Sequence, residues 1–343
     1  MSRRPLSTHG ITEGALLAAL VAVFAVAAHY VPVLGAASLF MVPLPLAVLV
    51  IRLGLRAAFL ATAVAGIIAA AITGPLIGIG ILLTFAPFGI VVGLGVRKGR
   101  SAAAILATAA LVGVASLVVD LALTLALSGV NPYQITIEAM QRSQETSMDF
   151  YRHLGLAPAR LEGLESYNRQ MRQFLNLMPL FIPVLLLMAG TVLAWVNYQV
   201  GRPILRRLGY LLPALPPLST WRIPPYGLWL LPLAYVFVLV GPRGGTTLVD
   251  PLRSVPSLRE IGIPLAIGLN LLVATQVGFA FQGVLVAWVL LKRYVVMKMI
   301  RVFILVLIIF NPLLGYLAML LGMAESVFLI RERVAPSAPA EDL

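Results

Sequence analysis

Residues 102–128 read AAAILATAALVGVASLVVDLALTLALS, a continuous apolar run in which Asp120 is the only charged residue. About 20 apolar residues in a helix are enough to cross the hydrocarbon core of a bilayer. The rest of the chain agrees with this stretch, because 60% of its 343 residues are hydrophobic, 11% are charged and the mean hydropathy is +0.99. A soluble domain carries roughly 25% charged residues. The sequence therefore predicts an all-α integral membrane protein and excludes a soluble globular domain.

Further apolar stretches on both sides of this run predict a polytopic transmembrane bundle of about eight or nine spans. The short stretches 36–51 and 225–241 contain prolines, which favour broken or thin helices. Residues 302–330 contain Asn311-Pro312 near their middle, and we expect one span there, with a re-entrant hairpin as the alternative. The expected spans are residues 11–31, 36–51, 54–74, 76–96, 102–128, 174–200, 225–241, 261–291 and 302–324.

The basic residues orient these spans. With the N-terminus in the cytoplasm, the inner loops hold fifteen basic residues and no acidic one, whereas the outer loops hold eight basic and seven acidic residues. Basic residues gather in cytoplasmic loops of membrane proteins. The net charge of +12 therefore reflects topology and indicates no nucleic-acid partner. We expect a multi-pass protein of the bacterial cytoplasmic (inner) membrane with a cytoplasmic N-terminus.

The sizeable polar insertion, residues 131–173, is expected on the outer side. Asn131-Pro132 is a favourable helix start, because a capping side chain precedes a proline at the first helical position. Apolar residues then recur at helical spacing on both sides of a break at Gly155 and Pro158. The insertion therefore predicts two extracytoplasmic amphipathic helices. They either cover the ends of the bundle or form a lid over an outward-facing site.

Polar residues inside the spans are the candidates for substrate binding. Asp120 is the clearest, since a charge at the centre of a membrane helix costs about 2.5–3.5 kcal/mol on insertion scales. It either binds a cationic or hydrogen-bonding substrate group or carries a proton, or it has a structural role in which it pairs with an arginine or caps a broken neighbouring helix. Asn270 has a matching depth and Gln276 follows it, although hydrogen bonding between helices also explains such amides. His29 either faces the same cavity or lies at the membrane interface.

Motifs for catalysis and cofactor binding are missing from the sequence. Cysteine is absent, the three histidines are scattered, and no glycine-rich loop continues into the Lys-Ser/Thr of an ATP-binding motif. We expect no enzymatic activity, no metal and no cofactor. If ATP drives this protein, a separate subunit must hydrolyse it.

The first 200 residues resemble a known class of transporter subunit. The first span contains two small-xxx-small pairs, Ala15 with Ala19 and Ala18 with Ala22, which favour close docking of another helix. A Leu53-Gly54-Leu55-Arg56 turn opens the third span. This combination resembles the substrate-binding S components of energy-coupling-factor vitamin transporters. The resemblance implies a six-span bundle over residues 1–200, a vitamin-like substrate, and a transmembrane coupling subunit with ATPases that dock on these alanines.

The whole chain is more similar to the YybS-like bacterial membrane proteins, also described as domain of unknown function 2232. Three segments carry this resemblance: Trp221-Arg222-Ile223-Pro224, Phe281-Gln282-Gly283, and the closing segment with Glu325, Phe328 and Arg331. That family tends to have aspartate where this chain has Glu325. The resemblance implies additional C-terminal spans over residues 201–330, followed by a polar tail at 331–343. It brings no biochemical activity with it.

Three functions fit the sequence. The first is a substrate-binding component of a small-molecule transporter, energised by separate subunits. The second is a non-transporting membrane scaffold that recruits partners to the cell envelope. The third is a self-sufficient proton-coupled carrier that uses Asp120.

Overall fold

The structure is a computed structural model, and it describes residues 8–31, 40–129, 131–154, 158–240, 262–294 and 297–334. Helices make up the regular structure of these residues, which confirms the all-helical class. Six helices are long and apolar enough to cross a membrane, or seven if one bent pair counts as a span. Two shorter apolar helices, Pro43–Arg52 and Pro225–Val240, cover the stretches that were expected to be short.

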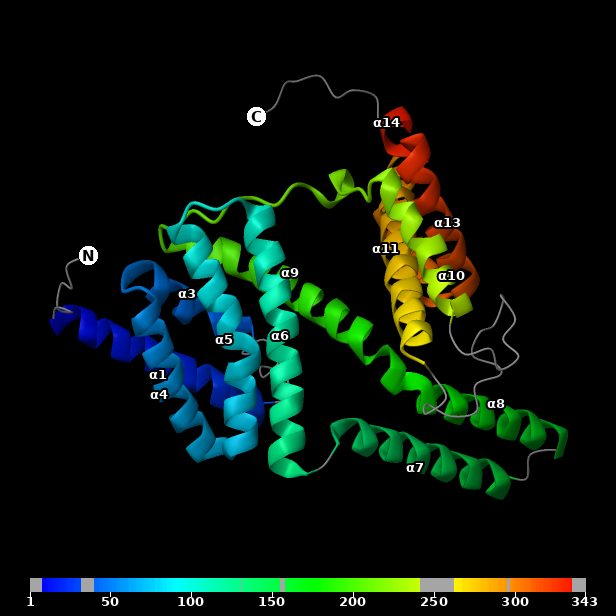
Figure 1. Cartoon of the computed structure of the whole chain (residues 1–343), viewed down its shortest axis with the longest axis horizontal. Coiled ribbons are helices and arrows are strands. Elements are labelled where there is room, and N and C mark those ends of the chain that lie inside the picture. Colours follow the sequence, from blue (N-terminus) through cyan, green and yellow to red (C-terminus); the bar gives the residue numbers. More distant parts are fainter. Residues whose placement is uncertain are drawn as a thin grey trace. The chain divides into compact units, whose positions relative to one another are not determined.

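The chain divides into two compact units. Unit 1 comprises residues up to Leu175 together with Leu185–Leu215, and unit 2 comprises Asn176–Val184 and the residues from Pro216 onward. The main break along the chain therefore lies near residue 215, whereas the sequence suggested residue 200. The helices that belong wholly or mainly to unit 1, coloured from blue to green in Figure 1, are α1 (Thr8–Tyr30), α3 (Pro43–Arg52), α4 (Leu55–Thr73), α5 (Pro75–Arg97), α6 (Ala102–Ser128), α7 (Pro132–His153), α8 (Pro158–Leu177) and α9 (Ile182–Arg207).

Tight turns set the direction of α3, α4 and α5. Gly54 and Gly74 end α3 and α4 with φ values of 90° and 94°. Glycine adopts this region readily because it lacks a Cβ atom. Pro75 then begins α5, where its missing N–H leaves no helical hydrogen bond unmade. These turns fold the three helices against one another within a few residues of chain.

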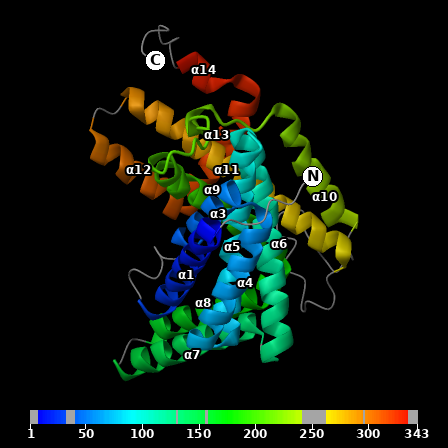
Figure 2. The same ribbon diagram turned by 90° about the vertical axis from the view of Figure 1, so that its left-hand side faces the viewer.

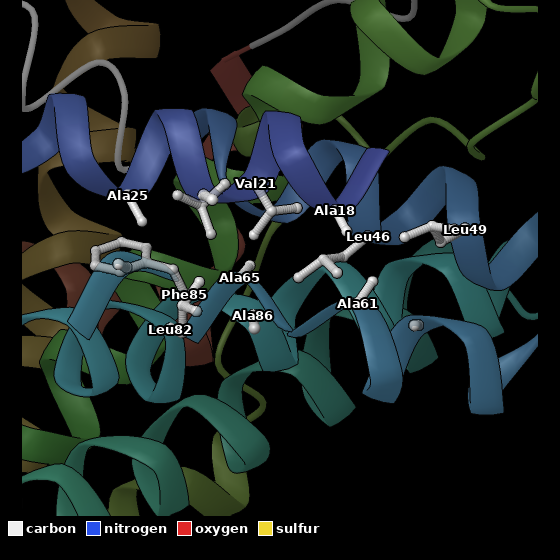
Figure 3. Packing of buried hydrophobic residues seen from close by; sticks show 14 of the residues in the cluster. Ala18, Val21, Ala25, Leu46, Leu49, Ala61, Ala65, Leu82, Phe85 and Ala86 are labelled. Atoms are coloured by element: carbon white, nitrogen blue, oxygen red, sulfur yellow. The ribbon is translucent and has the colours of Figure 1, made fainter. Parts of the chain in front are cut away.

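Small side chains form the core of unit 1 (Figure 3). Ala18, Val21 and Ala25 of α1 are buried against Leu46 of α3 and Ala65 of α4. Ala22 is buried as well, so the pair Ala18–Ala22 packs inside the unit and offers no surface to another protein. Ala15 and Ala19 lie on the exposed face. The docking surface expected on the first span is therefore limited to that second pair.

The short helix α3 is surrounded by protein. All residues from Pro43 to Val50 are buried, although a single exposed face would be ordinary for a membrane helix. Glycines of α5 make this possible, because a Cβ atom on Gly89 would lie 2.2 Å from the carbonyl oxygen of Pro43. Such close backbone approach requires glycine. α3 is therefore an internal element of unit 1, which explains why it tolerates two prolines near its start.

Polar contacts tie three segments together at one end of unit 1. The guanidinium of Arg52, at the end of α3, donates to the carboxylate of Glu13 near the start of α1. It also donates to the hydroxyl of Tyr210, which follows α9. Residues Arg52 and Tyr210 therefore lie on the same side of unit 1, as the expected orientation requires.

Unit 2 is built around a long helix, α11 (Ile263–Tyr294). It packs against α10 (Leu230–Val240) and α13 (Pro312–Phe328), while α10 and α12 (Lys298–Phe310) lie on opposite sides of it in Figure 2. The short pieces are the 3₁₀ helices η1 (Met178–Phe181), η2 (Leu218–Thr220) and η3 (Pro225–Trp229), and the terminal helix α14 (Ile330–Val334).

The contact between α11 and α13 is exceptionally close. A Cβ atom on Gly283 would lie 1.6 Å from the carbonyl oxygen of Ala318, and one on Gly322 would lie 1.9 Å from that of Phe279. The two backbones therefore touch, as in small-xxx-small contacts of membrane helices. No side chain larger than a hydrogen atom fits at either position without separating the helices.

The expected last span is bent. α12 and α13 meet at an angle of 98° at Asn311, whose side chain caps α13 by accepting from the backbone N–H groups of Leu313 and Leu314. The helix expected over 302–324 is therefore broken at Asn311, since proline at position 312 ends the first helix and the capped second helix leaves in a new direction. The pair forms either a broken span or a re-entrant loop. Beyond α13, Arg331 donates to the carbonyl oxygen of Trp221 at 2.7 Å.

This bend predicts a re-entrant pair whose two ends are on one side of the membrane. Trp221 belongs to the segment that links Tyr210 to η3, and Tyr210 bonds Arg52. Since the sequence contains no cysteine, single introduced cysteines can be labelled with a membrane-impermeant thiol reagent. We expect Arg333→Cys to label from the same side as Arg56→Cys, with Ser147→Cys on α7 labelling from the other side. Labelling of Arg333→Cys together with Ser147→Cys would instead indicate a complete crossing.

Candidate functional site

Asp120 lies within the interface between α6 and α5. Its carboxylate faces Gly80, where a Cβ atom would lie 2.9 Å from Oδ1, and the hydroxyl of Thr84 is its hydrogen-bonding neighbour one turn further along α5. Ser116, one turn before Asp120 on α6, is buried. The absence of a side chain at Gly80 leaves the carboxylate room beside the α5 backbone.

The charge of Asp120 has no cationic partner in the part of the chain that the structure describes. The ion pairs found there involve other carboxylates, including Glu13 and Glu325. The described residues therefore show no arginine paired with Asp120. A carboxylate in an apolar environment is stable when it binds a cation, accepts hydrogen bonds or carries a proton. This arrangement can do each of these.

His29 lies at the exposed end of α1, away from the α5–α6 interface. Its ring contacts that of Tyr30 edge to face, with centroids 4.7 Å apart, and the Tyr30 hydroxyl donates to the carbonyl oxygen of Ile72 at 2.9 Å. α1 packs mainly on α3 and α4 and makes a smaller contact with α5, where the neighbours of Asp120, Gly80 and Thr84, lie, but no contact joins His29 to Asp120 among the described residues. The structure does not bring His29 to Asp120.

Asn270 belongs to unit 2, and its amide is occupied by backbone groups. Nδ2 donates to the carbonyl oxygens of Leu180 and Ala266, both at 2.8 Å, and Oδ1 accepts from the backbone N–H of Val184 at 3.1 Å. These bonds pair backbone groups at the junction between η1 and α9. Hydrogen bonding between segments thus accounts for Asn270. Gln276 is half-buried further along α11.

The most extensive polar site among the described residues is centred on Glu325, which was not predicted as a site residue. This carboxylate has 0% exposure. Its Oε1 accepts from Nε of Arg331 at 2.8 Å and from Nη2 of Arg222 at 3.1 Å, and its Oε2 accepts from the backbone N–H of Arg331 at 3.0 Å. Glu325 is therefore held from three directions.

Amide and hydroxyl groups extend this arrangement. Nε2 of Gln282 donates to the Ser326 hydroxyl at 2.9 Å and to the Gly322 carbonyl at 2.8 Å, while its Oε1 accepts from the backbone N–H of Ile223. Ser326 in turn donates to the carbonyl oxygen of Ile223 at 2.9 Å. We call this set of side chains the Glu325 cluster: Arg222, Gln282, Glu325, Ser326 and Arg331.

Charge is balanced around this cluster. Arg222 bonds Glu325 and also, through Nη1, the carboxylate of Glu332 at 3.0 Å. Burial lowers the pKa of Arg222, but the hydrogen bonds to Glu332 and Glu325 outweigh that effect and the pKa is raised above its ordinary value. Arg222 therefore stays charged, and two guanidinium groups face two carboxylates. These bonds hold the segments of the cluster together, while the buried Nε of Arg222 has no hydrogen-bond partner in the described part of the chain.

A signal for the cluster was present in the sequence. The segments Trp221–Pro224, Phe281–Gly283 and Glu325–Arg331, which carry the resemblance to the YybS-like family, are the ones that meet here. They lie up to 110 residues apart in the chain. Nothing in their local composition indicates that they contact one another.

These observations define a multi-pass membrane protein with polar groups held inside a helical bundle. A family model described as "Predicted membrane protein (DUF2232)" matches residues 19–326, and the chain belongs to this family. It is also similar to the uncharacterized protein YybS of Bacillus subtilis (strain 168), with 27% identity over 217 residues, which cover 63% of this chain and 68% of that protein. No solved structure matches the chain. The expected similarity to the YybS-like family is confirmed.

Proposed function

We propose that this protein is a substrate-binding membrane component of a small-molecule transporter, and that unit 1 binds the molecule at Asp120. One observation carries this proposal: Asp120 is a carboxylate within a membrane helix that has no cationic partner in the described ranges. Glu325, by contrast, is neutralised by two arginines. An uncompensated carboxylate is costly in lipid, and such residues mark substrate or proton sites.

The substrate class follows from the chemistry of this position. Asp120 and the Thr84 hydroxyl offer acceptors to one cationic or hydrogen-bond-donating group, and the apolar walls of α5 and α6 suit a vitamin-like molecule. α7 and α8 serve as the lid on the outer side. Asn270 is not assigned to the site because backbone groups already use its amide. His29 and Gln276 remain secondary candidates.

In this proposal, separate subunits supply the energy, and the chain itself is assigned no enzymatic activity and no cofactor. The exposed pair Ala15–Ala19 on α1 is the docking surface for a transmembrane coupling subunit, and ATPases bind to that subunit. The N-terminus is cytoplasmic in a bacterial inner membrane.

We predict that Asp120→Asn removes the bound molecule. Loss of one charge-assisted hydrogen bond lowers affinity by roughly tenfold or more. Native mass spectrometry of protein extracted from its own membrane measures the retained metabolite and any bound subunits. Asp149→Asn makes the same chemical change on the exposed face of α7 and serves as the matched control. Equal retention by both variants, or no retained molecule in the unmodified protein, would refute a binding site at Asp120.

A membrane scaffold is the second candidate, favoured by the polar hairpin of α7 and α8. Arg152 links the two helices by an ion pair to Glu165 at 2.9 Å, and most other side chains of the hairpin are exposed. If the protein recruits envelope partners, deletion of residues 131–173 abolishes partner capture, whereas Asp120→Asn leaves it intact. The two variants thus separate the scaffold from the transport component.

A further inference from the structure

Three arginines gather around a hollow at the end of α9. Arg202 and Arg206 are one helical turn apart, Arg207 follows, and together with Gln199 and Pro203 they line a space of about 600 Å³. Arg202 is half-buried, whereas Arg206 and Arg207 are exposed. The hollow lies within unit 1, on the turn where α9 changes from apolar to basic residues.

These guanidinium groups have no counter-ion among the residues that the structure describes. In the described part of the chain, no carboxylate lies within ion-pair distance of Arg202, Arg206 or Arg207, although Arg52 and Arg222 both have such partners. The helix C-terminus stabilises positive charge, but its effective charge is only about −0.5. Three formal charges within two turns therefore exceed what the helix end balances, and the surplus favours a bound anion.

The position of the hollow indicates where this anion comes from. The apolar part of α9 is long enough to cross a membrane, so the basic turn lies at the level of the lipid headgroups. On the same face as Gln199, Val192 and Leu185 are spaced by seven residues and are 57% and 44% exposed. An acyl chain can lie along this apolar stripe while its headgroup phosphate occupies the hollow.

We propose that the hollow formed by Gln199, Arg202, Arg206 and Arg207 binds the phosphate of an anionic phospholipid. Arginine suits this ligand because its planar guanidinium bonds two phosphate oxygens at once. Gln199 is placed to bond the glycerol or ester oxygens beside the phosphate. The proposal stands independently of substrate binding at Asp120.

The test compares two variants with the same loss of charge. Full-length protein in detergent is titrated with phosphatidylglycerol or with phosphatidylcholine, and bound lipid is counted by native mass spectrometry. In the triple variant Arg202→Gln, Arg206→Gln, Arg207→Gln, phosphatidylglycerol affinity falls about a hundredfold, because each basic residue near an anionic surface contributes roughly a factor of five. The control replaces three exposed basic residues of unit 1 on the expected inner side by glutamine: Arg56, Lys98 and Arg100.

The expected result is that the control retains phosphatidylglycerol nearly as well as the unmodified protein, and that phosphatidylcholine binds all forms weakly. Equal loss in both triple variants would overturn the proposal in favour of general surface attraction. Displacement of phosphatidylglycerol by millimolar inorganic phosphate would also overturn it and indicate a soluble phosphate compound. If the triple variant does not fold, the single exposed change Arg206→Gln is expected to lower affinity about fivefold, and an unchanged affinity refutes the site.

Discussion

Replacing Glu325 by alanine is expected to lower the free energy of unfolding of unit 2 by about 3–5 kcal/mol, as removal of one partner from a buried ion pair does in other proteins. Arg331, only 6% exposed, would then lie in the interior without its carboxylate. Arg222 would lose one of its two acidic partners. Thermal unfolding in detergent, followed by tryptophan fluorescence, measures the change because Trp221, Trp229 and Trp288 lie in unit 2.

Two further variants separate the ion pair from other effects of the substitution. Glu332→Ala removes the other carboxylate bound to Arg222, but its side chain is 64% exposed, so a change of about 1 kcal/mol or less is expected. The double variant Glu325→Ala, Arg331→Ala should be less destabilised than the sum of its single changes, since neither charge is left alone. Equal melting of Glu325→Ala and Glu332→Ala would show that the Glu325 cluster does not stabilise unit 2.

Adding a single methyl group at Gly283 is expected to separate α11 from α13. The new Cβ atom would lie 1.6 Å from the carbonyl oxygen of Ala318, a backbone atom that no change of rotamer can move away. Overpacking typically costs 1–3 kcal/mol, and we expect Gly283→Ala to reach about 3 kcal/mol or more because backbone meets backbone. Gly322→Ala meets Phe279 in the same way and should behave alike.

The matched control lies on the same helix. A Cβ atom on Gly278 would lie 3.4 Å from Cδ1 of Ile223, which is ordinary contact with a flexible side chain. Gly278→Ala should therefore change stability little, and replacing a helical glycine by alanine even favours the helix by about 1 kcal/mol. The yield of monodisperse protein and its melting temperature measure both variants. If Gly283→Ala is as stable as Gly278→Ala, the two helices are not in backbone contact.

The helical class and most spans could be predicted from the sequence because apolar length alone decides them. α3 could not be fully described in this way. Its apolar residues suit lipid or protein surroundings equally, and only the structure shows that the chain itself covers it. The alanine pairs of α1 present the same difficulty, since both faces of a helix can be small and the sequence does not say which face turns inward.

The polar sites could be predicted from the sequence only where the free-energy cost of a charge in the membrane singles out one residue. Asp120 stands out because a charge lies in the middle of an apolar run. Glu325 does not, because it lies near the end of its helix and its main partner, Arg331, falls in a segment expected to be polar tail. The matching depths of Asn270 and Asp120 in the membrane suggested that the two residues share a site. Depth does not show how each helix is rotated about its axis, and Asn270 in fact accepts from the backbone N–H of Val184 at the start of α9.

The close spacing of Glu325 and Arg331 has a consequence for biosynthesis. Arg222 emerges from the ribosome about a hundred residues before its acidic partner Glu325, whereas Arg331 follows Glu325 by six residues. Domains of a growing chain fold in the order in which they are made. The carboxylate of Glu325 can therefore leave the translocon already paired with Arg331, so that no unpaired negative charge enters the membrane. Arg222 then joins the end of α13 to a segment that was synthesised about a hundred residues earlier.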